Sequence, residues 1–123
     1  MEEVWITGMG LITSIGNDRE TVTSSLLELK HGIEQHPELQ GNDSPVKIAG
    51  TVKDFTVSSS DPEDWEYPEQ YRVPRAVLRS FSPHVLYAWS SLSQAIQDAS
   101  LSEDDLHDPD AGLYTSSGGS MRS

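Results

Sequence analysis

The sequence predicts a mixed α/β fold, and three observations lead to this prediction. A short run of β-branched and aromatic residues, 4–7, is followed by a loop that contains several glycines. Two segments, 19–30 and 83–99, repeat apolar residues every three or four positions, which is the period of an amphipathic helix. A second short apolar run, 111–115, leads into glycine and serine, so we expect a last strand there.

Length and charge bound the kind of protein this is. The chain has 123 residues, which suits one domain, 1–123. Eight basic and twenty acidic residues give a net charge of −12, so nucleic acid is not expected as a partner because the field repels phosphate. No apolar run approaches the ~20 residues that a membrane span needs, and no membrane association is expected.

The amino terminus and the absence of cysteine bear on location and chemistry. The start Met1-Glu2-Glu3 lacks the positive charge and apolar stretch of a secretory signal, which points to the cytoplasm. The sequence has no cysteine, which removes disulfides, thiolate metal sites and thiol catalysis together. No metal cluster or cofactor motif is present in the sequence, so no cofactor is expected.

The glycine loop follows residues 4–7, which are predicted to form a short buried strand. Glycine can approach neighbouring backbone where a side chain would not fit, as we expect at Gly8, Gly10 and Gly16. A strand followed by glycines can cradle a dinucleotide, but Thr13 occupies the third glycine position of that fingerprint. A structural glycine turn is the better interpretation, and a nucleotide-binding enzyme stays an alternative.

The first helix is predicted over 19–30. Asn17 and Glu20 have the spacing of a helix cap and its returning carboxylate, and Gly32 is the expected left-handed stop. The helix is expected to lie against the first strand. Its apolar stripe consists of Val22, Leu26, Leu29 and Ile33.

The middle of the chain is predicted to be mostly irregular. Residues 34–45 are polar and turn-forming, and residues 46–53 alternate as in a half-exposed strand. Residues 58–70 combine serine, proline and acidic residues, so we expect a surface excursion there. Trp65 and Tyr67 are expected to pin this excursion down by burying ring area.

The second helix has the clearest periodicity. Ser82 is a good cap and Pro83 a good first-turn residue, and Trp89 is interpreted as core packing. A short turn capped by Ser102 is expected to follow. The predicted core stripe of the helix consists of Val85, Trp89, Leu92, Ile96 and Ala99, with Leu86, Ala88 and Ala95 beside it.

Three of the eight basic residues precede this helix within eight positions: Arg72, Arg75 and Arg79. One interpretation is that they pair with acidic residues nearby in the sequence. The other is a local basic surface on which an anionic partner docks. The acidic residues that the first interpretation names are Asp64, Glu66 and Glu69.

Three segments, taken together, resemble one enzyme family. Residues 4–17 with the following Leu29-Lys30-His31-Gly32-Ile33, residues 93–101, and residues 111–120 are similar, in order and spacing, to β-ketoacyl-acyl-carrier-protein synthases. Ser100 stands where the family usually has glycine. The resemblance implies an acyltransferase of fatty-acid or polyketide synthesis with a thiolase-like fold, of which the chain covers the first strands and helices.

The resemblance also implies functional positions. Arg75 and Arg79, with Arg72 less closely, match basic positions at which the family docks the acyl carrier protein, although Ala76 stands where relatives often add another cation. A last loop borders the acyl channel in the family, whereas its composition alone indicates a flexible loop. That acyl-channel loop consists of Gly118, Gly119 and Ser120.

No bond-making residue is expected in this chain. The family uses a cysteine thiolate and two histidines, whereas the chain has no cysteine, and its four histidines lie outside the matching positions. We therefore interpret the chain as the amino-terminal portion of a synthase, inactive alone and prone to associate through exposed sheet edges and apolar faces. A homodimer is the family expectation for the full-length enzyme. A non-catalytic module that binds a carrier protein or a synthase remains an alternative.

Overall fold

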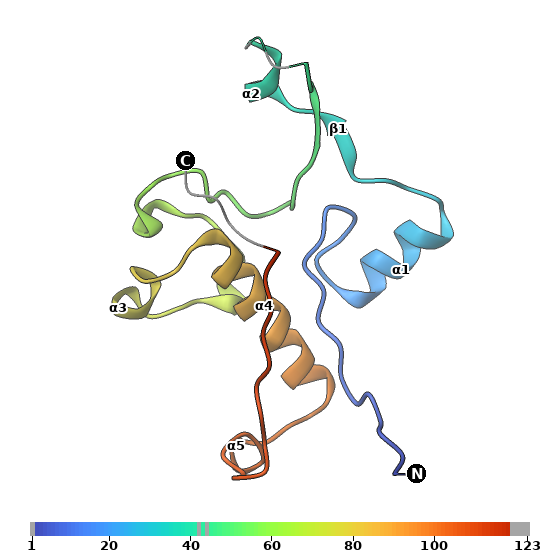
Figure 1. The fold of residues 1–123 in the computed structure, drawn as a ribbon, viewed down its shortest axis with the longest axis vertical. Helices are drawn as coiled ribbons and strands as arrows, with labels where there is room; N and C mark the ends of the chain where they lie inside the picture. Colours follow the sequence, from blue (N-terminus) through green and yellow to red (C-terminus); the bar gives the residue numbers. More distant parts are fainter. Residues whose placement is uncertain (1, 42, 44, 119–123) are drawn as a thin grey trace.

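The computed structural model describes residues 2–41, 43 and 45–118. It confirms a mixture of helices and strands, in which the long helix α4 lies at the centre (Figure 1). In the described parts of the chain, no helix combines the length and apolar character that crossing a bilayer requires. The elements, in order, are α1 (Arg19–Leu27), β1 (Ile33–Gln35), α2 (Pro37–Gln40), β2 (Ile48–Gly50), the 3-10 turns η1 (Pro62–Asp64) and η2 (Glu69–Tyr71), α3 (Arg75–Leu78), α4 (Pro83–Asp98) and α5 (Glu103–Leu106).

Helix α4 starts where the sequence predicts, with Ser82 as N-cap and Pro83 in the first turn. Its most buried residues are Leu86, predicted to lie beside the apolar stripe, and Ser90. Leu86 is 0% exposed, whereas Val85 and Trp89 of the predicted stripe are exposed. The cause is the chain before the helix, which packs against Leu86 in the buried cluster. The indole nitrogen of Trp89 donates to the Tyr71 carbonyl at 3.1 Å.

The buried core lies between the loop after β2 and the start of α4. Phe55 stacks on Tyr71 with ring centroids 6.4 Å apart and meets Tyr87 edge-on at 5.4 Å. These offset and edge contacts are the favoured arrangements of aromatic pairs. The buried hydrophobic members of this cluster are Phe55, Trp65, Tyr71, Val73, Leu78 and Leu86.

The predicted pinning of the 58–70 excursion is confirmed. Trp65 is buried, and its indole nitrogen donates to the Ser59 carbonyl at 2.8 Å. The Tyr67 hydroxyl accepts a hydrogen bond from the Val73 amide at 3.3 Å. The two rings therefore hold a polar segment against the core, and that segment includes η1 and η2.

The predicted buried strand over residues 4–7 is wrong. These residues form no secondary structure, and Val4, Trp5 and Ile6 are 93%, 78% and 85% exposed. A strand needs a hydrogen-bonding neighbour, and in the described part of the chain β1 and β2 pair with each other instead. The predicted strand over 111–115 is wrong for the same reason, because residues 111–118 are exposed and unpaired with any described strand.

The predicted close approach of the first glycines is confirmed. A Cβ on Gly8 would lie 2.3 Å from the Ala95 carbonyl oxygen, and a Cβ on Gly10 would lie 1.8 Å from that of Ser91. Both glycines therefore let the amino-terminal segment lie directly on the backbone of α4, along which it runs in Figure 1. Because the helix fills this space, the glycines leave no opening for a dinucleotide phosphate.

Helix α1 is shorter than the predicted 19–30. The cap is Asp18 rather than Asn17, because the Asp18 carboxylate accepts from the Thr21 amide at 2.7 Å. The Asn17 side chain donates instead to the Lys53 carbonyl at 2.6 Å. The left-handed residue after the helix is Leu29, with φ of 56°, rather than the predicted Gly32.

The apolar stripe of α1 is also largely uncovered. Val22 and Ser25 are the buried residues of this helix, whereas Leu26 and Leu29 are exposed. The Ser25 hydroxyl donates to the Ile15 carbonyl at 2.7 Å, which fixes the helix to the loop that precedes it. Local hydrogen bonds, more than apolar burial, therefore hold α1 in place.

Strands β1 and β2 form a small antiparallel sheet in the region predicted as a loop and a strand. Ile33 faces Gly50 and Gln35 faces Ile48 across the pair. The alternation over 46–53 thus marked a real strand, although β2 is shorter, and the predicted loop 34–45 contains the end of β1 and all of α2. The turn capped by Ser102 is confirmed as α5, with a reciprocal capping box between Ser102 and Asp105.

Candidate functional site

The three arginines singled out in the sequence lie together, and we call Arg72, Arg75 and Arg79 the arginine patch. Pro74 is the N-cap of α3, Arg75 is its first residue, and Arg79 is its C-cap. Residues four apart lie on the same face of a helix, so Arg75 and Arg79 point to the same side. The single turn of α3 is what brings these two guanidinium groups together.

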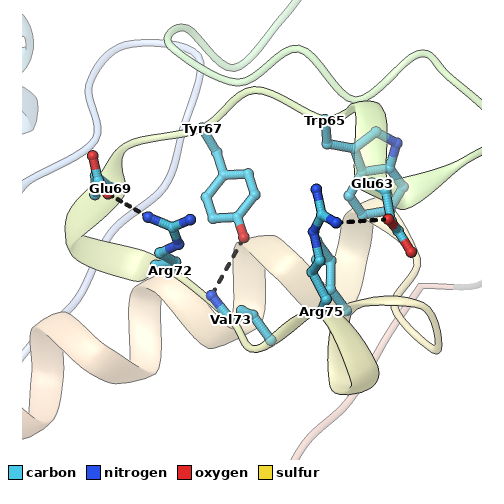
Figure 2. Close-up of a pocket in the computed structure, with 8 residues that line it drawn as sticks. Glu63, Trp65, Tyr67, Glu69, Arg72, Val73 and Arg75 are labelled. Atoms are coloured by element: carbon cyan, nitrogen blue, oxygen red, sulfur yellow. Dashed lines mark hydrogen bonds and ion pairs between the residues drawn. The ribbon is translucent and has the colours of Figure 1, made fainter.

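Acidic side chains of the chain itself occupy the arginine patch. Glu63 meets two arginines, with Oε2 at 3.7 Å from an Arg75 terminal nitrogen and Oε1 at 2.6 Å from Arg79 Nε. Arg72 pairs with Glu69 at 2.6 Å. Figure 2 shows the pairs of Arg72 and Arg75 on the two sides of the Tyr67 ring.

The pairing prediction is therefore right in kind and partly wrong in detail. Glu69 is one of the predicted partners and does pair. Asp64 instead accepts from the Ser59 hydroxyl at 3.0 Å, and among the described residues Glu66 has no basic side chain within ion-pair distance. The carboxylate that meets Arg75 and Arg79 is Glu63, which the sequence did not single out.

The turn η1 positions Glu63. The Asp61 side chain caps the turn by accepting from the Glu63 amide at 2.9 Å. Immediately after the turn, the buried Trp65 fixes the backbone to Ser59. Both ends of the three-residue turn are thus held, and the Glu63 carboxylate is presented to α3 from a fixed backbone.

The arginines and the glutamate of these ion pairs differ in solvent exposure. The Arg75 and Arg79 side chains are 80% and 69% exposed, whereas the Glu63 side chain is 23% exposed. The Glu63 carboxylate, which accepts a hydrogen bond from Arg79 Nε, raises the pKa of that guanidinium above its ordinary value. Both arginines face solvent, as a site for an anionic surface requires.

A shallow hollow of about 280 Å³ adjoins the arginine patch. Its lining combines the buried side chains of Trp65, Val73 and Leu78 with the charged side chains of arginines and glutamates. Figure 2 shows the lining residue Tyr67 between Arg72 and Arg75, with its hydroxyl turned to the Val73 amide. Such a lining offers charged groups beside a small apolar area.

The other predicted site is not part of this surface. Gly118 is exposed and has open space where a Cβ would be added. Gly119 and Ser120 lie outside the described residues. The assignment of these three residues to an acyl channel therefore stays a prediction.

A second hollow, of about 490 Å³, lies between α1 and α4, and sequence reasoning did not find the residues that line it. There the Gln94 side-chain oxygen accepts from the Leu11 amide at 3.0 Å. One turn later, Asp98 accepts from the Met9 amide and from Arg19, each at 3.1 Å. These polar groups tether the amino-terminal segment to α4, and their spacing of four along a helix was the available signal.

Comparison with known proteins places the chain among enzymes of one family. The whole sequence, residues 1–123, matches the N-terminal domain of β-ketoacyl synthases. It is 35% identical over 118 residues to the 3-oxoacyl-[acyl-carrier-protein] synthase 1 of Haemophilus influenzae, covering 96% of this chain and 26% of that protein. The synthase 1 of Escherichia coli is 35% identical over 120 residues, which is 97% of this chain and 26% of that protein.

A synthase of another type is also similar. The 3-oxoacyl-[acyl-carrier-protein] synthase 2 of Staphylococcus aureus is 27% identical over 117 residues, covering 95% of this chain and 25% of that protein. The chain therefore spans about a quarter of the length of the relatives that it matches.

Proposed function

Because the chain belongs to the β-ketoacyl synthase family, we propose that it serves the condensation of acyl and malonyl thioesters carried by an acyl carrier protein. The reaction joins the two acyl units by forming a carbon–carbon bond as the malonyl group loses carbon dioxide. Its setting is fatty-acid or polyketide synthesis. This setting is supported by the names of the relatives, which include the acyl carrier protein.

The proposed part of this chain in the reaction is recognition of the carrier. The observation that carries this proposal is the geometry of Arg75 and Arg79, which are exposed, four positions apart and on one face of α3. Exposed guanidinium groups with a fixed spacing suit the carboxylates of an acidic helix, to which arginine can donate two hydrogen bonds at once. Arg72 extends the same surface toward η2.

Docking matters here because the substrate reaches the enzyme on a carrier. A complementary charged surface speeds encounter and sets the orientation in which the thioester arm enters the site. The chain's net charge of −12 makes a local basic surface more significant, since an acidic carrier is repelled elsewhere. The arginine patch is thus proposed to choose where the carrier lands, while the thiolate chemistry is assigned to no residue of this sequence.

Other family features are proposed on the same basis. Family membership supports a thiolase-like fold, a homodimer for the full-length enzyme and a cytoplasmic setting. It also supports the assignment of Gly118, Gly119 and Ser120 to the border of the acyl channel. Small side chains at these positions would let an acyl chain lie close to the backbone.

The proposal is tested by measuring the affinity of the chain for purified acyl carrier protein. The double variant Arg75→Ala, Arg79→Ala is expected to bind at least about tenfold more weakly, because two charged contacts are lost. Its free energy of unfolding is expected to change by less than about 1 kcal/mol, since both side chains are exposed. Isothermal titration calorimetry and urea unfolding provide the two readouts.

The matched control is the double variant Arg19→Ala, Lys30→Ala. It removes the same number of positive charges from α1 and the loop after it, where Arg19 pairs with Asp98 and Lys30 with Glu28. Carrier affinity close to that of the unaltered chain is expected for this control. Equal weakening of both double variants would mean that net charge alone governs binding, and the docking assignment would be wrong.

A further inference from the structure

We propose that Glu63 regulates the arginine patch by occupying Arg75 and Arg79 in place of a partner's carboxylate, so that the carrier must displace it to dock. This inference rests on the proposed docking function and adds a regulator to the same surface. Nothing in the family resemblance points to this residue. The contacts, the anchoring of η1 and the local charge each support the inference.

One carboxylate serves two arginines in this arrangement. Glu63 Oε1 is 2.6 Å from Arg79 Nε, and Glu63 Oε2 is 3.7 Å from Arg75. Each oxygen thus meets one guanidinium, as two oxygens of an incoming carboxylate would. While Glu63 is in place, a partner's carboxylate cannot take the Nε hydrogen bond of Arg79.

The contact between Glu63 and α3 is presented from an anchored backbone. Glu63 lies 16 positions before Arg79 in the sequence. The Asp61 cap on one side and the buried Trp65 on the other hold η1, the turn that contains Glu63, in place. A carboxylate presented from a fixed backbone loses little conformational entropy when it pairs. Glu63 is therefore a stronger competitor than a free side chain on a long loop.

The local charge around the arginine patch explains why Glu63 affects the attraction for an anionic partner. Residues 61–79 contain five acidic and three basic residues, so the segment is net negative despite the arginine patch. Removing the charge of Glu63 leaves Arg75 and Arg79 without an ion-pair partner among the described residues. The attraction for an anionic partner then rises where the arginines face solvent.

Displacement exchanges one set of ion pairs for another. The partner's carboxylates gain Arg75 and Arg79, and the Glu63 side chain, already 23% exposed, turns to water. The net gain is smaller than the new contacts alone would give, which keeps binding weak and release fast. Rapid release suits a carrier that must deliver its thioester and leave.

The test compares Glu63→Gln with Glu66→Gln. Both variants remove one negative charge within the same segment, but among the described residues Glu66 has no ion-pair partner. Glutamine keeps the length of the side chain and one oxygen acceptor. Neither Glu63 nor Glu66 is buried. Binding of purified acyl carrier protein is measured by calorimetry for the unaltered chain, the two variants and Arg75→Ala, Arg79→Ala.

The Glu63→Gln variant is expected to bind the carrier roughly threefold to tenfold more tightly than the unaltered chain, and Glu66→Gln by less than about twofold. Equal tightening by both variants, or unchanged or weaker binding by Glu63→Gln, would overturn the inference. If Arg75→Ala, Arg79→Ala lowers affinity while Glu63→Gln leaves it unchanged, the docking proposal stands and only the regulator fails. If the arginine variant binds as the unaltered chain does, the docking proposal itself fails.

Discussion

Two regions of this molecule both carry large apolar side chains but differ in how far those side chains are buried. Residues 55–86 supply one buried cluster that includes Leu86, which is 0% exposed. The amino-terminal residues 4–6 and the carboxyl-terminal residues 113–114 carry comparable side chains, yet Trp5 and Tyr114 are 78% and 96% exposed. Apolar character is therefore not what separates them.

The difference lies in what each region has to pack against. The buried cluster is supplied by the loop after β2, by α3 and by α4, which lie close together along the chain. A strand at 4–7 or 111–115 would need a neighbouring strand to take its backbone hydrogen bonds, and the described part of the chain uses its two strands on each other. Burial thus follows the availability of a partner surface, and three pairs of substitutions sharpen this comparison.

The largest effect is expected from Leu86→Ala at the centre of the buried cluster. The substitution should lower the free energy of unfolding by about 3 kcal/mol, because it removes buried methyl groups and leaves a cavity. Val4→Ala, at a side chain that is 93% exposed, should change it by less than about 0.5 kcal/mol. Urea unfolding of both variants measures the difference between the two losses of stability. Similar losses for Leu86→Ala and Val4→Ala would show that Val4 is buried in solution.

A smaller effect is expected where the amino-terminal segment touches α4. Gly10→Ala would place a Cβ 1.8 Å from the Ser91 carbonyl oxygen, so the segment must move away from the helix. We expect a loss of about 2 kcal/mol in the free energy of unfolding. The control is Gly41→Ala, which meets nothing within 4 Å. Equal stability of the two variants would show that the segment does not lie on α4.

The smallest effect concerns the cap of α1, a helix with little apolar burial. Asp18→Ala should lower the free energy of unfolding by about 1 kcal/mol at neutral pH. Ser82→Ala should cost less, because the Ser82 side chain makes no capping hydrogen bond to α4. Chemical unfolding at neutral pH tests this order, and an equal loss in both variants would contradict the importance of the Asp18 cap.

The Asp18 effect should also depend on pH. Hydrogen bonds from the Thr21 amide and hydroxyl lower the pKa of the Asp18 carboxyl. A group with a lowered pKa in the folded state contributes stability above its unfolded pKa and loses it as pH falls through the folded pKa. The difference between the unaltered chain and Asp18→Ala should therefore shrink below about pH 4. A difference that stays constant down to pH 2.5 would contradict the charged cap.

Local signals in the sequence predicted the two longest helices, α1 and α4, and predicted their packing poorly. The period of apolar residues and the Ser82-Pro83 pair placed the start of α4 correctly. The stripe was predicted to centre on Val85 and Trp89 with Leu86 beside it, whereas Leu86 is the fully buried residue, because the buried face depends on where the preceding loop folds back. Periodicity describes a helix surface, whereas the covering element is set by tertiary structure.

The candidate site divides in the same way. The clustering of Arg75 and Arg79 could be predicted, because their spacing of four becomes one face when a helix forms. Their partner Glu63 could not, because the short turn η1 decides which of several neighbouring acidic side chains faces α3. The sequence predicted that the arginines form ion pairs, but the structure was needed to identify which acidic side chain pairs with Arg75 and Arg79.

The most direct test of the central claim, that a carrier protein docks on α3, locates the contact residue by residue. The ¹⁵N-labelled chain is titrated with unlabelled acyl carrier protein, and backbone amide shifts are followed by nuclear magnetic resonance. We expect the largest changes at residues 61–79, with those of α1 and α5 nearly unmoved. Changes concentrated at the exposed residues 4–6 or 113–114, or no changes at all, would contradict docking at the arginine patch.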